Sequence, residues 1–424
     1  MLDYINSFAG RLVRKFIFSY FPYCSTSSLR RFLTKKTRLW KNVADLAEKI
    51  RRKDAITVAF TVTDLPRWRS DHVIQRMMQA SRFRPFIWIL PIFEDSEEQA
   101  RNLETMKAYF DEHNYEVAVY STLEEIRAKY APDIVILSLL VSEPINVLDM
   151  DRELTCYVPY CYQNTRKLDF INRQSCYVWR NFYATPGIKK VASSVMANGG
   201  CNVVAVGSPV ADNYFSAAAG DSPSVWRSCG EGMKRVIWAP HWSVGNVSWF
   251  NVATFLDVAD DMVRLAEKYA SRVQWAFKPH PALRSTLYNH HDWGKEKTDA
   301  YYDRWANMPN CQLETGAYVD LFKQSDAMVH DSGSFIMEYL LVNKPCMYLR
   351  KQGGFNDFND DTLKALDCYH RGSTAQDVEK FIQDLLSGTE DTMKEKRARF
   401  RDEYLLPPGG SCAQLIIDEI LNGK

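Results

Sequence analysis

The sequence contains no long hydrophobic run. None of its apolar stretches approaches the roughly 18 residues that a membrane-spanning helix needs. Near the N-terminus, Arg11, Arg14 and Lys15 interrupt any run that could serve as the apolar part of a signal peptide. The ten cysteines are scattered, with no C-x-x-C pair and no Cys/His spacing typical of a zinc site. These absences predict a cytoplasmic protein with reduced, mostly buried thiols and no bound metal.

The common phosphate-binding and nucleophile motifs are absent as well. The chain has neither G-x-x-x-x-G-K-[ST] nor G-x-G-x-x-G, which excludes the usual P-loop and dinucleotide fingerprints. It also lacks a G-x-S-x-G elbow, so serines at candidate sites are interpreted as hydrogen-bonding groups and not as acyl nucleophiles. No cofactor is expected.

Positive and negative charges balance over the whole chain but not along it. The net charge is +1, yet residues 1–53 hold 13 Lys and Arg against three acidic residues. Basic residues mixed with aromatic ones, such as Phe16, Tyr20 and Trp40, are typical of a helix on an anionic membrane surface. The alternative is a solvated basic helix packed on the body of the protein. The pattern predicts a peripheral protein on the inner face of the cell membrane. Because the rest of the chain is near neutral, no nucleic-acid partner is expected.

Short apolar runs alternate with amphipathic helical patterns along the chain. A hydrophobic fraction of 46% and a charged fraction of 25% are typical of a globular protein. Strands that alternate with helices form parallel βαβ units, so the sequence predicts an α/β fold. The predicted strands are 55–62, 85–93, 116–120, 133–140, 156–162, 235–240, 273–279, 327–331 and 345–349. The predicted helices are 71–81, 95–113, 122–130, 250–270, 317–324, 334–343, 375–387 and 390–404.

A stretch of small and turn-forming residues, 216–233, interrupts this alternation and is the predicted linker. It separates two Rossmann-like halves that we expect to face each other across a ligand cleft. The predicted divisions are a basic amphipathic segment 1–53, a first domain 54–218, a second domain 219–404 and a C-terminal helix 405–424 that docks the two halves together.

Three predicted strand ends in the second half carry basic and polar side chains. They are Ala239-Pro240-His241-Trp242-Ser243, Lys278-Pro279-His280-Pro281 and His330-Asp331-Ser332-Gly333-Ser334. Ligands of open parallel sheets bind at the carboxyl ends of strands, so we expect these groups to cluster. Carboxylates are few, which disfavours a metal. Cations, hydroxyls and N–H donors suit a phosphate or pyrophosphate. The alternative for Asp331 to Ser334 is a simple helix cap.

These motifs resemble the CDP-glycerol glycerophosphotransferase family of teichoic-acid and capsule enzymes. The resemblance rests on the Lys-Pro-His-Pro motif at 278–281 and on a segment that follows it. That segment contains Ser325, Asp326, Asp331, Ser332, Gly333, Ser334, Glu338, Tyr339, Lys344 and Pro345. Further matches are Gly207, Pro209 and Asp212, the strand end at 239–240 and the helix 409–421. The similarity is strong over 200–424 and weaker over 55–200.

The resemblance implies a GT-B-like fold and a transfer of glycerol phosphate from CDP-glycerol, or of a similar polyol phosphate, with release of CMP. The acceptor would be a hydroxyl of a lipid-linked or polymeric polyol or sugar. Lys278, His280, Asp331, Ser332, Gly333 and Ser334 would bind the donor phosphates, and His280 would also be catalytic, since it could neutralise the charge that develops during transfer. Glu338 would reach ribose hydroxyls; a surface or capping glutamate is the alternative.

One departure from the family affects the general base. The family often has a histidine in the first half, whereas this chain has Tyr-Val-Pro-Tyr-Cys-Tyr-Gln-Asn at 157–164. The substitutes are Asp64, Asp71-His72 and His241. His241 is the first candidate and His72 the second, since histidine has a suitable pKa. For His72, helix capping at Asp71-His72 is the alternative. The aromatic stretch 160–186 is either an acceptor-binding wall or a packed inter-domain loop.

Two other functions fit the sequence. A GT-B glycosyltransferase could use a nucleotide sugar at the same strand ends. A non-catalytic nucleotide-binding partner in a capsule assembly complex could have lost the first-half histidine. Donor preference distinguishes the first of these from the phosphotransferase, and nucleotide binding without turnover would indicate the second.

Overall fold

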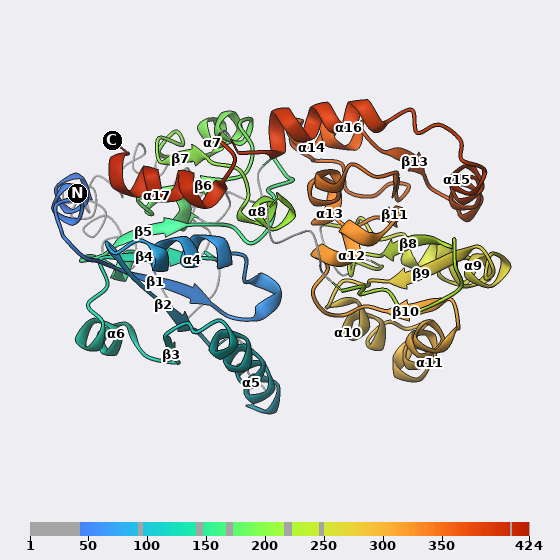
Figure 1. Ribbon diagram of the computed structural model, residues 1–424, viewed down its shortest axis with the longest axis horizontal. Coiled ribbons are helices and arrows are strands. Elements are labelled where there is room, and N and C mark those ends of the chain that lie inside the picture. The colour runs from blue at the N-terminus through green and yellow to red at the C-terminus, as the bar shows by residue number, and fades with distance from the viewer. Residues whose placement is uncertain are drawn as a thin grey trace, which may run out of the picture.

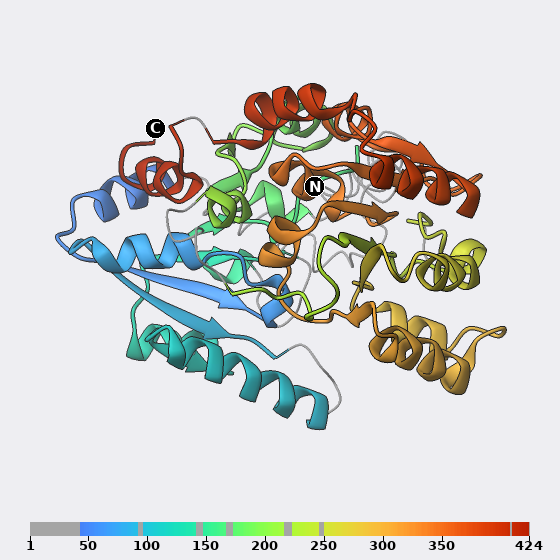
Figure 2. The same ribbon diagram turned by 45° about the vertical axis from the view of Figure 1, so that its right-hand side comes forward.

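The protein consists of two parallel α/β halves that lie side by side (Figure 1 and Figure 2). The computed structural model describes residues 43–91, 96–140, 147–166, 173–215, 223–245, 250–407 and 409–423. Most of the basic segment 1–53 lies outside the described residues. Within the described ranges, no helix is both long and apolar enough to cross a membrane. The predicted α/β fold with two Rossmann-like halves is confirmed.

The first half is built on a seven-stranded parallel sheet with the order β3-β2-β1-β4-β5-β6-β7. The strands are β1 (Ile56–Val62), β2 (Phe83–Ile89), β3 (Val117–Val119), β4 (Ile134–Leu137), β5 (Leu154–Tyr157), β6 (Arg180–Tyr183) and β7 (Val203–Ala205). The helices are η1 (Leu65–Arg67), α4 (Asp71–Gln79), α5 (Ser96–Glu112), α6 (Leu123–Lys129), η2 (Val147–Asp149), η4 (Arg173–Cys176), α7 (Ile188–Val195) and α8 (Pro209–Phe215). Side chains of β1 point alternately to the two faces of the sheet, and both faces are buried. Val58 and Phe60 pack on the face covered by α4, and Ala59 packs on the face covered by α6.

The second half repeats this plan with a six-stranded parallel sheet in the order β10-β9-β8-β11-β12-β13. The strands are β8 (Lys234–Ala239), β9 (Val273–Phe277), β10 (Cys311–Leu313), β11 (Ala327–His330), β12 (Cys346–Leu349) and β13 (His370–Gly372). The helices are α9 (Phe255–Lys268), α10 (Leu283–Tyr288), α11 (Gly294–Asn307), α12 (Val319–Gln324), α13 (Phe335–Glu338), η6 (Tyr339–Val342), α14 (Asp360–Leu366), α15 (Ala375–Ser387), α16 (Lys394–Phe400) and η7 (Arg401–Leu405).

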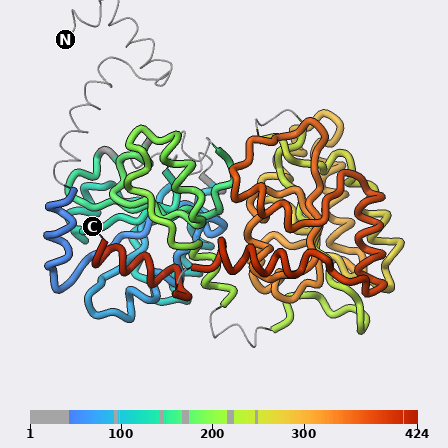
Figure 3. Tube along the Cα trace, turned by 90° about the horizontal axis from the view of Figure 1, so that it is seen from above, coloured from blue at the N-terminus to red at the C-terminus, as the bar shows by residue number. Residues whose placement is uncertain are grey.

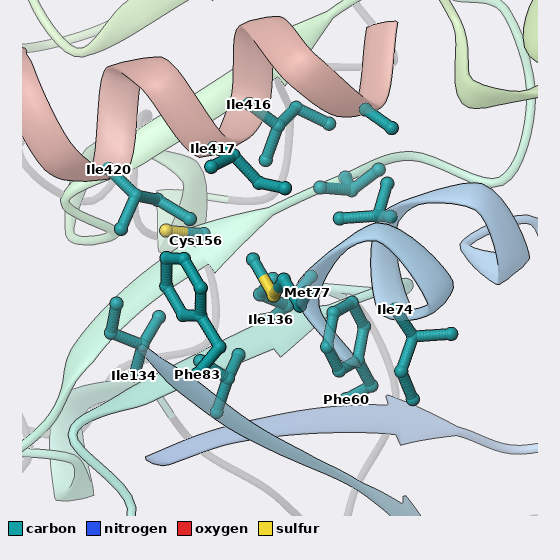
Figure 4. Close-up of a cluster of buried hydrophobic side chains, with 14 of the residues drawn as sticks. Phe60, Ile74, Met77, Phe83, Ile134, Ile136, Cys156, Ile416, Ile417 and Ile420 are labelled. Atoms are coloured by element: carbon teal, nitrogen blue, oxygen red, sulfur yellow. The ribbon is translucent and has the colours of Figure 1, made fainter. Parts of the chain in front are cut away.

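The chain returns to the first half through its C-terminal helix, α17 (Cys412–Asn422). Figure 3 shows this segment passing from the second half to the first, and Figure 4 shows Ile416, Ile417 and Ile420 packed against α4 and the first sheet. The helix therefore packs on the first half, and its link to the second half is the chain itself.

The last part of the predicted basic segment is helical and packs on the first half. Residues 43–51 form a helix, and Ala47 and Ile50 belong to the same hydrophobic cluster as α4 and α17. The Nε of Arg51 donates to the backbone carbonyl of Ile420 (3.2 Å), which joins this helix to α17. The predicted domain divisions at 53, 218 and 404 stay predictions.

All strands in each sheet are parallel, but the order in which the chain adds them to the sheet changes direction between two neighbouring strands. These switch points are β1/β4 in the first sheet and β8/β11 in the second. The two edges face each other. Arg69, which follows β1 in the chain, contacts Tyr318, which follows β10. Asn164, which follows β5, contacts Gly333, which follows β11. Ligands of open α/β sheets bind at such points, so the fold brings two candidate binding edges together.

Candidate active site

Asp331 connects the two strands of the second switch point. Its Oδ1 accepts a hydrogen bond from the backbone N–H of His241 (2.6 Å). Its Oδ2 accepts from the backbone N–H (2.5 Å) and the hydroxyl (2.8 Å) of Thr254. Burial raises the pKa of Asp331 to about 6, and the hydrogen bonds from Thr254 and His241 oppose that rise. Both carboxylate oxygens are thus engaged by the protein, and they fix the loop that carries His241.

Lys278 and His280 follow β9 and lie beside this loop. The Nζ of Lys278 is buried and donates to the carbonyl of Gly316 (3.0 Å). Burial lowers the pKa of Lys278 to about 8. Burial also lowers the pKa of His280 to about 4, assisted by the positive charges of Lys278 and Arg67. The rings of His241 and His280 are 5.1 Å apart between centroids, so the predicted clustering of these two strand ends is present.

The hydrogen bonds of the two histidines define their proton positions. The Nδ1 of His280 accepts from the backbone N–H of Ala282 (3.1 Å). The Nδ1 of His241 accepts from the backbone N–H of Ser243 (3.3 Å) and lies 2.9 Å from the Ser243 hydroxyl, which itself accepts from Val252 N–H. Burial lowers the pKa of His241 well below its usual value. Both rings are therefore neutral near pH 7, and the backbone N–H groups directed at Nδ1 favour the tautomer with the proton on Nε2.

The Asp-Ser-Gly-Ser turn does not form the helix cap that its sequence suggested as an alternative. Ser334 occupies the N-cap position of α13, but its side chain makes no capping hydrogen bond, and its backbone is already helical. A Cβ on Gly333 would lie 2.9 Å from the ring of Phe250, so only glycine fits there. Ser332 is buried, and its carbonyl lies 3.1 Å from Nδ1 of His330. The hydroxyl of Ser334 therefore remains available for a ligand.

Glu338 is buried under two tyrosines. Its Oε1 accepts from the hydroxyl of Tyr214 (3.2 Å) and its Oε2 from the hydroxyl of Tyr318 (3.0 Å). Burial raises the pKa of Glu338 to about 7, while Arg69 opposes that rise. The predicted contact with ribose would require one of these tyrosines to give up its hydrogen bond.

Two arginines of the first half complete the cluster, and the sequence analysis did not include them. Arg69 donates to the hydroxyl of Tyr318 (3.1 Å), and its guanidinium lies 5.4 Å from the centre of that ring. The Nζ of Lys278 lies 5.6 Å from the same ring centre. Arg67 is paired with Asp64 (2.6 Å) and acts electrostatically on His280. Both arginines follow β1, so applying the strand-end rule to the first sheet would have identified them.

The structure does not bring His72 into this cluster. His72 lies in the first turn of α4, and among the described residues no hydrogen bond, ion pair or ring contact links it to the second half. Its neighbour Asp71 does not cap the helix. Its carboxylate accepts hydrogen bonds from Trp68 Nε1 (2.8 Å) and from the hydroxyls of Tyr109 (2.8 Å) and Tyr115 (3.0 Å).

The first described part of the aromatic stretch 160–186 contacts the second half. Thr165 forms an antiparallel bridge with Phe358. Asn164 donates from Nδ2 to the carbonyl of Gly333 (2.7 Å), and its own carbonyl accepts from Asn359 N–H (2.9 Å). The first bond holds the turn at 331–334 from across the interface, and the second joins residue 164 to the start of α14. The stretch also contains β6, so it is partly sheet and partly inter-domain contact.

A comparison with protein families identifies the family of this chain. Residues 172–422, more than half of the chain, match the family described as CDP-Glycerol:Poly(glycerophosphate) glycerophosphotransferase. The chain belongs to this family. The predicted resemblance is confirmed, and with it the predicted activity of a CDP-glycerol glycerophosphotransferase. A search of curated proteins finds no match.

Solved structures share the fold of this glycerophosphotransferase. The UDP-GlcNAc 2-epimerase from Neisseria meningitidis bound to UDP-GlcNAc has a TM-score of 0.58 at 13% identity, over 87% of this chain and 99% of that one. The wall teichoic acid polymerase TagF has a TM-score of 0.58 at 12% identity, over 92% and 97%. A TagF variant soaked with CDPG has a TM-score of 0.57 at 12% identity, also over 92% and 97%. These similarities establish the GT-B-like architecture.

Several residues that match the glycerophosphotransferase motif form hydrogen bonds that stabilise the fold. Lys344 donates from Nζ to the backbone carbonyls of Lys323 and Ser325. The hydroxyls of Ser325 and Tyr339 lie 2.7 Å apart. Asp212 accepts from the backbone N–H groups at the start of α17 (both 2.9 Å). The motif therefore combines groups that build the fold with groups that line the cleft.

Proposed function

We propose that this glycerophosphotransferase binds the pyrophosphate of CDP-glycerol between the two switch points. The observation that carries this proposal is the convergence of Lys278, His241 and His280 from one sheet with Arg67 and Arg69 from the other. Cations and N–H donors from both sides suit an anion that carries more than one charge. The turn that contains Ser332, Gly333 and Ser334 is near this cluster, because Gly333 lies against Phe250, whose ring is 5.6 Å from that of His241 between centroids.

In the proposed reaction, the oxygen of an acceptor hydroxyl attacks the phosphorus that carries glycerol. A new P–O bond forms, the bond from that phosphorus to the bridging oxygen breaks, and CMP leaves with the electron pair. Negative charge grows on the bridging oxygen. Lys278 and the Nε2–H groups of His241 and His280 stabilise that charge. The proton of the acceptor hydroxyl passes to solvent.

This assignment changes the role first expected for His241. A general base needs an unprotonated Nε2, but the N–H of Ser243 points at Nδ1 and favours the tautomer with the proton on Nε2. We therefore propose that His241 donates a hydrogen bond to phosphate, and that His280 does the same. His72 stays the second candidate for a base, without structural support for contact with the cleft.

The proposed acceptor is a polyol phosphate or sugar hydroxyl of a cell-surface polymer, as in teichoic-acid or capsule synthesis. The family description names poly(glycerophosphate), which supports a polymeric acceptor. We also propose that the basic segment 1–53 holds the protein on the inner face of the membrane, where a lipid-linked acceptor would be found. A vesicle-binding assay with and without anionic lipid tests this location.

Calorimetric binding of CDP-glycerol, CDP, CMP and a panel of UDP- and CMP-sugars tests the donor assignment. The comparison is wild type against His280→Ala, with His291→Ala, an exposed histidine, as the matched control. We expect CDP-glycerol to bind to wild type and to the control, and to bind at least about tenfold more weakly to His280→Ala. A preference for a nucleotide sugar would instead favour the glycosyltransferase alternative. Binding without turnover would favour a non-catalytic partner.

A further inference from the structure

A cavity of about 110 Å³ lies at the carboxyl ends of β12 and β13, beside the proposed phosphate site. Its walls come from the loop 350–358, from α14 and from Arg371 of β13. Tyr348 and Phe358 form the buried apolar part of the wall. None of these residues has a role in the donor site described above.

The rim of this cavity is positively charged. Arg350, Lys351 and Arg371 line it together with a single acid, Asp367. Arg371 is paired with Asp367, whereas no carboxylate in the described part of the chain pairs with Arg350 or Lys351. Two cations next to a cavity are thus left uncompensated, which favours an anionic ligand.

One aromatic ring separates the cavity from the transfer site. The ring of Phe250 lies 5.6 Å from that of His241 on one side and 4.6 Å from that of Phe355 on the other, between centroids. Phe355 lines the cavity, and Gly333 packs directly against Phe250. A ligand in the cavity would therefore be a close neighbour of a phosphate bound at His241.

The cavity also lies where the two halves meet. The loop that forms its wall pairs with the first half through Phe358 and Thr165, and Arg166 Nε donates to the carbonyl of Phe358 (3.1 Å). An acceptor that enters between the halves would pass this loop. The donor, in contrast, is held by the strand ends on the other side of Phe250.

We propose that this cavity binds a phosphate group of the acceptor, namely a phosphodiester of the polyol phosphate chain next to the hydroxyl that is attacked. The inference rests on the proposed function and deepens it by naming an acceptor that already carries phosphate. A neutral sugar acceptor would gain nothing from two uncompensated cations. A poly(glycerophosphate) chain carries one negative charge per repeat, and the guanidinium of Arg350 matches phosphate geometry.

The test measures transfer from CDP-glycerol to a synthetic glycerol phosphate oligomer. In the double variant Arg350→Gln/Lys351→Gln, we expect the KM for the oligomer to rise about tenfold or more, with kcat and CDP-glycerol binding unchanged. The matched control is Lys396→Gln/Arg399→Gln, which removes the same charge from exposed positions on α16. The variant Asn356→Trp fills the cavity without changing its charge, and we expect the same rise in KM.

Direct calorimetry of the oligomer without donor separates the possible failures. An unchanged KM and unchanged oligomer binding in both cavity variants would overturn the acceptor site. Equally weakened CDP-glycerol binding would assign the cavity to the donor and also overturn it. If wild type bound no CDP-glycerol but bound the oligomer through Arg350 and Lys351, the proposed donor site would fail while the phosphate site stood.

Discussion

At the scale of single residues, burial of the charged Lys278 side chain lowers the stability of the fold. Binding of the anionic donor would offset this loss. The side chain is 4% exposed, and within the described part of the chain its Nζ donates one hydrogen bond, to the carbonyl of Gly316. Glu314 favours the charged form of Lys278, and Arg69 disfavours it. Burial outweighs both effects. An anion in the cleft would restore the lost solvation, which explains why a lysine is tolerated there.

We predict that Lys278→Met stabilises the protein at pH 7 and abolishes CDP-glycerol binding. The pKa falls from 10.5 to about 8 on folding, which corresponds to about 3 kcal/mol; loss of the Gly316 bond offsets about 1 kcal/mol. Between pH 8 and pH 10.5 the unfolded state binds more protons, so wild-type stability rises with pH in that window. The advantage of the variant should therefore shrink there.

Urea unfolding at pH 7, 8, 9 and 10 checks this prediction. Lys189→Met, at an exposed position on α7, is the control and should follow wild type at every pH. A variant that is less stable than wild type at pH 7, with a parallel pH profile, would contradict the role of burial.

The candidate site was predictable from sequence only where its residues follow long strands of the second half. His241, Lys278 and Asp331 come directly after buried apolar runs, and strand topology alone brings them to one edge. Arg67 and Arg69 reach the site from the opposite half. The packing between the halves depends on contacts between residues far apart in the chain, which no local pattern contains.

At the scale of elements, Asp212 determines how α17 docks. Its Oδ1 accepts from Cys412 N–H and its Oδ2 from Ala413 N–H, both at 2.9 Å, and Ser411 Oγ donates to Oδ2 at 3.2 Å. A carboxylate at a helix N-terminus satisfies free N–H groups and interacts favourably with the helix dipole. Asp212 therefore links α8 to the N-terminus of α17 through these hydrogen bonds.

We predict that Asp212→Ala lowers the free energy of unfolding by about 2 kcal/mol, because the buried N–H groups at the start of α17 lose their acceptor. Hydrogen exchange of residues 412–422 should accelerate, while CDP-glycerol affinity stays within about twofold of wild type. The control is Asp418→Ala on the exposed side of α17, where the carboxylate bonds only to Gln414 in the hydrogen bonds described. If amide protection of α17 were the same in both variants, Asp212 would not determine how α17 docks.

The 14-residue helix α11 escaped prediction, and so did edge strands that are short and lack apolar runs. β10 has three residues and β13 reads His-Arg-Gly, so their strand conformation depends on pairing with β9 and β12. β6 begins with Arg180, which pairs with Glu419 of α17 at 2.6 Å. Where an apolar run is long and buried on both faces, as in β1, periodicity is sufficient. At the edges of a sheet, the neighbouring strand supplies the information.

At the scale of the whole molecule, a few polar contacts couple the halves around the site. Asn164 is central to them: its Nδ2 donates to Gly333 (2.7 Å), and its Oδ1 accepts from the hydroxyl of Thr362 (3.3 Å). Asn359 adds a bond from Nδ2 to the carbonyl of Gln163 (2.6 Å). Donor binding between the two halves should therefore stabilise both sheets.

We predict that Asn164→Ala weakens this coupling. A donor at 100 times its Kd stabilises the protein that binds it by about 2.7 kcal/mol, and a coupled half shares that gain. Hydrogen exchange of β1 and β8, with and without CDP-glycerol, measures how much the donor stabilises each sheet. In Asn164→Ala the gain at β8 should persist and the gain at β1 should fall. The matched control is Asn202→Ala, which removes an equally buried amide whose three bonds, to Ser175, Val178 and Asn198, stay within the first half. If β1 lost its gain equally in both variants, general destabilisation would explain the result. If it kept its gain in both, the halves would be coupled through their other contacts, such as Arg69–Tyr318 and Arg166–Phe358, and not through Asn164.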